Sequence, residues 1–142
     1  FMKNKIFFDT NIIVYLFDKS EEKKHAQAKK IVFASLQNVT SYISNQVMNE
    51  FIVVASQKIE NPIPLNRIRK NLEFLRTSLN IHTIDFATSL KGIDVKLEYH
   101  FSFWDSLVIA SALESNCSIL YSEDMQHGQV IEDKLRILNC FE

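Results

Sequence analysis

The fold is decided by the stretch Lys5-Ile6-Phe7-Phe8-Asp9-Thr10-Asn11, which lies near the start of the chain. Residues 5–8 form a continuous, largely apolar run, which is typical of a strand buried on both faces of a parallel sheet. Asp9 ends this run, and a short helical pattern over residues 11–17 follows it almost directly. A buried strand that passes at once into a helix predicts a domain of alternating strands and helices.

The rest of the chain continues this alternation. Apolar side chains recur at spacings of 4, 3 and 4 between Ile68 and Leu79, which is the pattern of an amphipathic helix. Further strands are predicted at residues 40–43, 81–84, 118–121 and 136–138, and helices at 21–37, 44–58, 65–79, 86–99 and 102–114, with Ser20, Ser44 and Ser102 as N-caps. We expect a single α/β domain over residues 2–142, a three-layer α/β/α structure with a mostly parallel sheet of four to five strands.

Composition excludes several classes of protein. The chain has 142 residues but only two glycines, Gly92 and Gly128, so it lacks every glycine-rich loop that binds phosphate. A net charge of −1 gives no overall attraction to nucleic acid, and no apolar run approaches the roughly 20 residues of a membrane span. Two isolated cysteines indicate free thiols in a reducing cytoplasm. Phe1 precedes Met2 and is taken as a residue left by cloning.

Four acidic residues lie where structure alone explains them poorly. Asp9 follows the first strand and Asp124 follows the fourth, and acids at such places can also serve as N-caps or turn residues. Glu50 has Val47, Val53 and Val54 as helical neighbours, so it faces the apolar side of its helix, where a salt bridge is the structural alternative. Asp105 has a similar setting near a helix start, where the helix dipole also favours an acid.

These four acids gain a common explanation if they meet in the folded chain. The carboxyl ends of parallel strands meet at one edge of the sheet, where active sites of such folds lie. Converging carboxylates repel one another unless a cation neutralises them, and Mg²⁺ or Mn²⁺ suits an all-oxygen site. The four histidines are scattered along the chain, so zinc is not expected. Metal-held carboxylates without a nucleophile motif indicate phosphodiester hydrolysis.

Four segments also occur in the order found in a known family of nucleases. They are Phe7-Phe8-Asp9-Thr10-Asn11, Asn49-Glu50-Phe51, Phe103-Trp104-Asp105-Ser106-Leu107 and Tyr121-Ser122-Glu123-Asp124-Met125. Over nearly its whole length the chain resembles PIN-domain nucleases, and in particular the VapC-type toxins of bacterial toxin–antitoxin pairs.

The resemblance implies a function and roles for particular residues. It implies a Mg²⁺- or Mn²⁺-dependent endoribonuclease that leaves a 3′-hydroxyl and a 5′-phosphate, acts as a homodimer and is inhibited by a small antitoxin protein. By position, the catalytic and metal-binding acids would be Asp9, Glu50, Asp105 and Asp124. Asn11 and Ser122 would orient these carboxylates by hydrogen bonds, Ser122 standing where many relatives have threonine.

Other residues have weaker indications. Arg67, Arg69 and Lys70 form a basic cluster for which a solvated helix face is the favoured explanation, and contact with the RNA backbone is the functional alternative. Trp104 is expected in the core beside Asp105, and His127 in a loop or a dimer contact.

Two other functions stay open. A haloacid-dehalogenase-like phosphatase would use Asp9 as its nucleophile, but it needs a second aspartate where this chain has Asn11. A non-catalytic RNA-binding or signalling module could use the same acidic pocket without hydrolysis.

Overall fold

The computed structural model describes residues 4–38 and 40–142, which contain a six-stranded sheet and six helices. The expectation for Phe1 therefore concerns a residue outside those described. The strands are β1 (Lys5–Phe8), β2 (Thr40–Ser44), β3 (Asn80–His82), β4 (Ile119–Tyr121), β5 (Val130–Ile131) and β6 (Leu135–Leu138). The helices are α1 (Thr10–Phe17), α2 (Glu22–Asn38), α3 (Asn45–Gln57), α4 (Leu65–Ser78), α5 (Phe86–Tyr99) and α6 (Phe103–Glu114).

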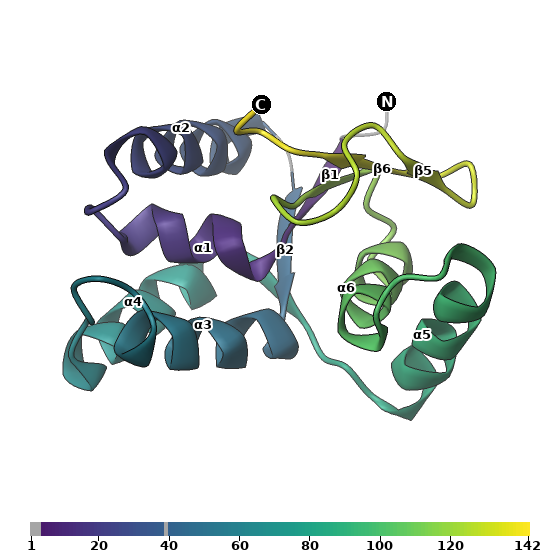
Figure 1. The fold of residues 1–142 in the computed structure, drawn as a ribbon, viewed down its shortest axis with the longest axis horizontal. Helices are drawn as coiled ribbons and strands as arrows, with labels where there is room; N and C mark the ends of the chain where they lie inside the picture. The colour runs from purple at the N-terminus through teal and green to yellow at the C-terminus, as the bar shows by residue number, and fades with distance from the viewer. Residues whose placement is uncertain (1–3, 39) are drawn as a thin grey trace.

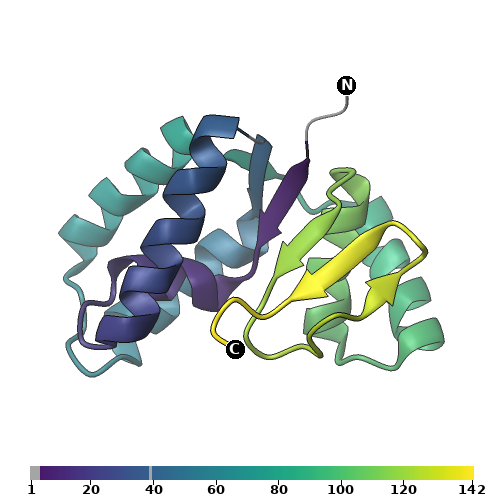
Figure 2. The same ribbon diagram turned by 90° about the horizontal axis from the view of Figure 1, so that it is seen from above.

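The sheet has the order β3-β2-β1-β4-β6-β5, and all pairs are parallel except β5 with β6. Helices α1 to α4 lie on one side of the sheet and α5 and α6 on the other (Figure 1). This confirms the predicted α/β fold with a mostly parallel sheet between helical layers. Seen from above, β1 runs through the middle of the sheet with β2 and β4 beside it (Figure 2).

The core explains why β1 is almost entirely apolar. Phe7 and Phe8 have no exposed surface, because helices cover both faces of the central strand. Ile12 and Ile13 of α1 are also fully buried and belong to the same cluster of core side chains. The apolar run therefore stabilises the strand at whose end Asp9 stands. No helix among the described residues is both long and apolar enough to cross a lipid bilayer.

Several predicted details were wrong. The sheet has six strands rather than four to five, because the short antiparallel strand β5 has only two residues and no recognisable pattern. Strand β3 covers Asn80–His82 rather than residues 81–84. Ser20 is not at the N-cap position of α2, because the helix begins at Glu22 and Glu21 directly precedes it. Trp104 is not in the core, because 64% of its surface is exposed.

Gly92 lies within α5, which continues through this glycine without a break. A Cβ atom at this position would lie 3.4 Å from Leu107 Cδ1 and 3.4 Å from Phe103 Cε1, both on α6. A methyl group would therefore just reach van der Waals contact with α6, so the packing of α5 on α6 leaves room for Ala but not for a larger side chain. The small residue at this position is explained by that packing, although a glycine weakens a helix by about 1 kcal/mol relative to Ala.

Candidate active site

Asp9 stands at the carboxyl end of β1 and caps the N-terminus of α1. Its Oδ1 accepts a hydrogen bond from the Thr10 backbone N–H at 2.7 Å, and its Oδ2 accepts one from the Ser122 hydroxyl at 2.8 Å. Only 6% of the residue is exposed. The predicted acid at the strand end is therefore both a helix cap and a nearly buried carboxylate.

Ser122 reaches Asp9 because β4 lies parallel to β1. The register pairs Phe8 with Tyr121, so the residues that follow the two strands come together at the same edge of the sheet. The Ser122 hydroxyl donates to Asp9 and accepts from the Asp124 backbone N–H at 3.3 Å. One buried hydroxyl therefore connects the two acids that follow neighbouring strands.

Asn11, on α1, holds the loop after β4 through two hydrogen bonds. Its side-chain Nδ2 donates to Asp124 Oδ2 at 3.1 Å, and its Oδ1 accepts from the Glu123 backbone N–H at 3.3 Å. The structure thus places both Asn11 and Ser122 beside carboxylates, as expected for residues that orient them.

Glu50 projects from the middle of α3 toward the start of α1. Its Oε2 accepts from the Thr10 hydroxyl at 2.9 Å, and its Oε1 accepts from Gln46 Nε2 at 2.8 Å. Neither Thr10 nor Gln46 was predicted to act at the site. Thr10 lies inside the motif Phe7-Phe8-Asp9-Thr10-Asn11, and Gln46 is the polar helical neighbour of Glu50 one turn earlier, a spacing that indicates contact with Glu50.

Asp105 lies in the first turn of α6, where Ser102 is the N-cap and accepts from the Asp105 backbone N–H at 3.1 Å. Burial raises the pKa of the Asp105 carboxyl, and the charges of Asp124 and Glu50 raise it further. Asp124 and Glu50 come from other elements, and like charges held close together disfavour the ionised form of each carboxyl.

All four predicted acids line one cleft of about 230 Å³ at the carboxyl edge of the sheet. Burial raises the pKa of Asp9 from 3.8 to about 6, the hydrogen bonds from Ser122 and Thr10 oppose this rise, and the charges of Asp105 and Glu50 add to it. A cluster of partly buried carboxylates without a counter-ion is costly, and a cation would relieve the repulsion.

The donor chemistry of the cleft fits a hard divalent cation, since carboxylate oxygens are the ligands that Mg²⁺ and Mn²⁺ prefer. Within residues 4–38 and 40–142, however, no three His, Cys, Asp or Glu side chains are placed so that they could hold one ion together. Glu50 and Asp124 are instead bound to Thr10 and Asn11. The residues suit a metal, and binding requires some carboxylates to turn toward one another.

Glu123 is adjacent to Asp124 but serves another purpose. It accepts a hydrogen bond from Tyr15 at 2.8 Å and forms an ion pair with Lys24. The ammonium group also lies 5.0 Å from the centre of the Tyr15 ring. These contacts hold the loop after β4 against α1 and α2. The acids of the cleft therefore do not include Glu123.

Four other residues that were considered for a functional role do not line the cleft. Arg67 lines a separate pocket at the end of α1, and Arg69 and Lys70 are exposed on α4. His127 accepts a hydrogen bond from the Asn139 backbone N–H at 2.9 Å through Nδ1, which ties its loop to the chain beyond β6. The structure brings the four acids together and leaves the basic cluster apart from them.

The sequence that carries these four acids matches a known protein family. The model of the PIN domain family matches residues 6–131, which is most of the sequence. The chain belongs to the PIN-domain family. All four acids of the cleft lie within the matched part of this PIN domain.

Solved structures with the same fold include several toxins. A toxin–antitoxin complex from Klebsiella pneumoniae superposes with a TM-score of 0.69 at 20% identity, covering 96% of this PIN domain and 98% of that chain. VapBC2 from Rickettsia felis, bound to a DNA fragment from its promoter, superposes with a TM-score of 0.66 at 17% identity, covering 94% of this PIN domain and 96% of that chain. VapC20 from Mycobacterium tuberculosis, a toxin that cleaves the sarcin–ricin loop, superposes with a TM-score of 0.64 at 16% identity, covering 81% of this PIN domain and 86% of that chain.

A search of curated protein sequences gave no match. At identities of 20% or lower, the structural likeness shows that the PIN domain shares its fold with these toxins.

Proposed function

We propose that this PIN domain is a metal-dependent endoribonuclease and the toxin of a toxin–antitoxin pair. The observation that carries the proposal is the acidic cleft, to which the junction between β1 and α1, helix α3, helix α6 and the loop after β4 each contribute one carboxylate. Four chain segments that are distant in sequence bring acids to one place although these acids repel one another. Such an arrangement destabilises the fold without a cation, so it is best explained by a metal-dependent reaction.

Asp9, Asp105 and Asp124 would hold Mg²⁺ or Mn²⁺, and Glu50 would complete the site or help a second ion to bind. A bound divalent cation supplies an activated water and neutralises charge on the attacked phosphate. Ser122 and the Thr10 backbone N–H keep the Asp9 carboxylate in a fixed orientation. The Thr10 hydroxyl and Gln46 do the same for Glu50.

Arg67, Arg69 and Lys70 would contact RNA beyond the cleaved phosphate. They are exposed on α4, and none of them lines the acidic cleft. Each contact with a phosphate reduces the apparent affinity as salt rises, so replacing all three with Ala should flatten the salt dependence of RNA binding. An unchanged slope would exclude them from the RNA site.

The partners would be a small antitoxin protein, which covers the cleft, and a second copy of the chain. Toxin–antitoxin complexes are among the structures with this fold, which supports the antitoxin. A stripe of exposed apolar residues along α5 supports a homodimer, since large exposed apolar patches mark protein interfaces. The stripe consists of Phe86, Leu90, Ile93 and Leu97. Sedimentation of the wild type against Leu90→Glu tests the dimer, and a wild-type monomer would exclude it.

The test of the nuclease is cleavage of single-stranded RNA with Mg²⁺ or Mn²⁺. Asp9→Asn and Glu50→Gln should each reduce cleavage by about 100-fold or more, because each removes a charged ligand. Asp133→Asn is a matched control, since Asp133 is exposed, does not line the cleft and has a φ of 55°, which Asn tolerates.

Cleavage that continues in excess EDTA and yields cyclic phosphates would contradict the proposed mechanism. The same preparations separate the alternatives. A trapped phosphate ester on Asp9 would indicate the phosphatase, and RNA binding without metal-dependent cleavage would indicate the non-catalytic module.

A further inference from the structure

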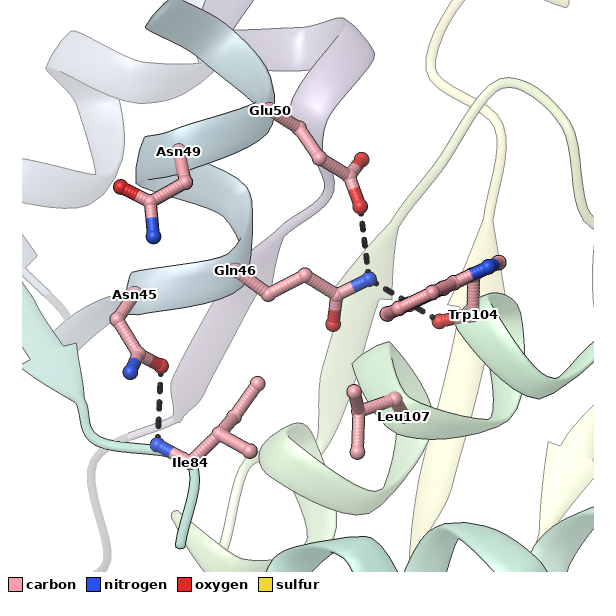
Figure 3. A pocket seen from close by; sticks show the side chains of 7 residues that line it. All are labelled: Asn45, Gln46, Asn49, Glu50, Ile84, Trp104 and Leu107. Atoms are coloured by element: carbon pink, nitrogen blue, oxygen red, sulfur yellow. Dashed lines mark hydrogen bonds between the residues drawn. The ribbon is translucent and has the colours of Figure 1, made fainter.

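A second pocket, of about 520 Å³, opens between α3 and α6 beside the acidic cleft. Gln46, Glu50 and Trp104 line both spaces, so the pocket and the cleft share a wall. Figure 3 shows the other side chains around it, which come from α3, from α6 and from the segment before α5. Pockets of this size are large enough for small planar ligands. Whatever occupies it would lie directly next to the proposed site of cleavage.

Trp104 offers an aromatic face at this pocket. It is the second residue of α6 and the only tryptophan of the chain, and 64% of its surface is exposed. Phe103 contacts its ring edge to face, with 5.7 Å between ring centroids. In Figure 3 the indole extends from α6 toward the amide of Gln46. An exposed tryptophan beside an acidic cleft suits stacking with a planar ligand, and bases of single-stranded RNA stack in this way.

The amide side chains of α3 supply polar groups at the opposite wall. Gln46 Nε2 donates to Glu50 Oε1 at 2.8 Å and to the Trp104 carbonyl oxygen at 3.3 Å. Both partners are acceptors, so the amide cannot turn over. In Figure 3 its Oε1 points toward the space between Ile84 and Leu107, two other residues that line the pocket. This Oε1 is buried and has no hydrogen-bond partner. Leaving a buried acceptor unpaired is unfavourable, so a donor from a ligand would stabilise the site.

We propose that this pocket binds an RNA base next to the cleaved phosphate, and that it prefers a base with an exocyclic amino group. Trp104 stacks on the base, and Gln46 Oε1 accepts from the amino group of adenine, cytosine or guanine. Uracil has no amino group, and its two carbonyl oxygens flank its single N–H and repel the fixed acceptor. In Figure 3 Ile84 and Leu107 lie on the side of the Gln46 amide to which Oε1 points. Because Oε1 is buried, the proposal requires these two side chains to move apart when the base enters.

The proposal rests on the proposed function, because it takes RNA as the ligand, but binding can be measured without cleavage. The full chain carrying Asp9→Asn is titrated with the oligonucleotides rA4, rC4 and rU4 in Mg²⁺ while Trp104 fluorescence is recorded. We expect rA4 and rC4 to quench the fluorescence and to bind about tenfold more tightly than rU4. Gln46→Ala should remove this preference, because it removes the acceptor.

A further Trp104→Ala change should weaken rA4 binding about tenfold or more, measured by anisotropy of labelled RNA, and Trp104→Phe should restore most of it. Phe33→Ala is the matched control, since Phe33 is an exposed aromatic residue of α2 that does not line the pocket, and it should leave affinity unchanged. Equal binding of rA4 and rU4, or unchanged affinity in Trp104→Ala, would overturn the proposal.

Two outcomes separate this proposal from the nuclease itself. If the wild type cleaves no RNA but the oligonucleotides quench Trp104 with the expected preference, only the proposed hydrolysis fails. If the wild type cleaves RNA and Trp104→Ala changes the oligomeric state but not RNA affinity, the pocket contacts protein and the base site is wrong.

Discussion

Replacing Asp9 with Asn should make the metal-free protein more stable at neutral pH. Asp9 is 6% exposed, and burial together with neighbouring charges raises its pKa from 3.8 to about 6. At about 1.4 kcal/mol per pH unit, ionising this carboxyl in the folded protein costs about 3 kcal/mol relative to the unfolded chain. Asn has the same shape and carries no charge, so it removes this cost.

The hydrogen bonds around Asp9 can be retained by Asn. Its Oδ1 can accept from the Thr10 N–H, and its Nδ2 can donate to the Ser122 oxygen once that hydroxyl turns away. Hydrogen bonds to a neutral group are weaker than those to a carboxylate, so we expect a net gain of about 1–3 kcal/mol. For a domain of this size, this corresponds to a rise in Tm of about 3–10 °C.

The pH dependence provides an internal check on this reasoning. Because the pKa of Asp9 is raised in the folded state, the cost is absent below about pH 4 and complete above about pH 6. The free energy of unfolding of the wild type therefore falls as pH rises through that window, because Asp9 must ionise while buried. That of Asp9→Asn does not fall for this reason, because Asn carries no charge. The advantage of the variant should be large at about pH 7.5 and vanish at about pH 4.

The assay is thermal unfolding in EDTA at both pH values, followed by circular dichroism. Asp18→Asn is a matched control, because Asp18 is equally buried, at 6% exposed, but lies outside the cleft. It should lose stability, since its carboxylate accepts hydrogen bonds from Ser20 N–H and hydroxyl groups. An Asp9→Asn protein that is less stable at about pH 7.5, or equally favoured at both pH values, would refute the reasoning.

Further predictions concern Ser122, Gly92 and Cys117. Ser122→Ala should lower the metal-free free energy of unfolding by about 1–3 kcal/mol at neutral pH and less at about pH 4, where Asp9 is protonated; chemical denaturation at both pH values measures it. Gly92→Ala should be neutral or stabilising by up to about 1 kcal/mol, whereas Gly92→Val should lower Tm, because its extra methyl groups collide with α6. Burial raises the pKa of Cys117 to about 12, so iodoacetamide should modify this thiol only after unfolding. Because Cys140 is partly exposed, alkylation is followed in a Cys140→Ser variant, and rapid alkylation of Cys117 in the native protein would contradict its burial.

The fold was predictable from sequence where a pattern has only one physical explanation. A run such as Ile6-Phe7-Phe8 can be buried on both faces only between helical layers, so the central parallel strand followed from it. Strand β5 could not be predicted, because two residues carry no periodicity and their pairing depends on β6. The helix over residues 86–99 was predicted, but the reason for a glycine in its middle was not, because that reason lies in the packing against α6.

The candidate site was predictable to a similar degree. Glu50 was predicted as a site residue because an acid on the apolar face of a helix needs a binding partner, and Glu50 lines the cleft. Thr10 and Gln46 are polar residues of ordinary appearance, and only their hydrogen bonds to Glu50 reveal a positioning role. Trp104 was placed in the core because large aromatic residues are usually buried, and no sequence pattern indicated that the indole would face solvent.

The hydrogen bond between Ser122 and Asp9 joins residues 113 positions apart, and this separation has a consequence for synthesis on the ribosome. A growing chain carries Asp9 from the beginning, but β1 keeps one edge unpaired until β4 is made. Only then do Ser122 and Asp124 take their places at the cleft. Nascent chains that stop before β4 therefore contain at most three of the four acids, and these acids are not held together in a cleft.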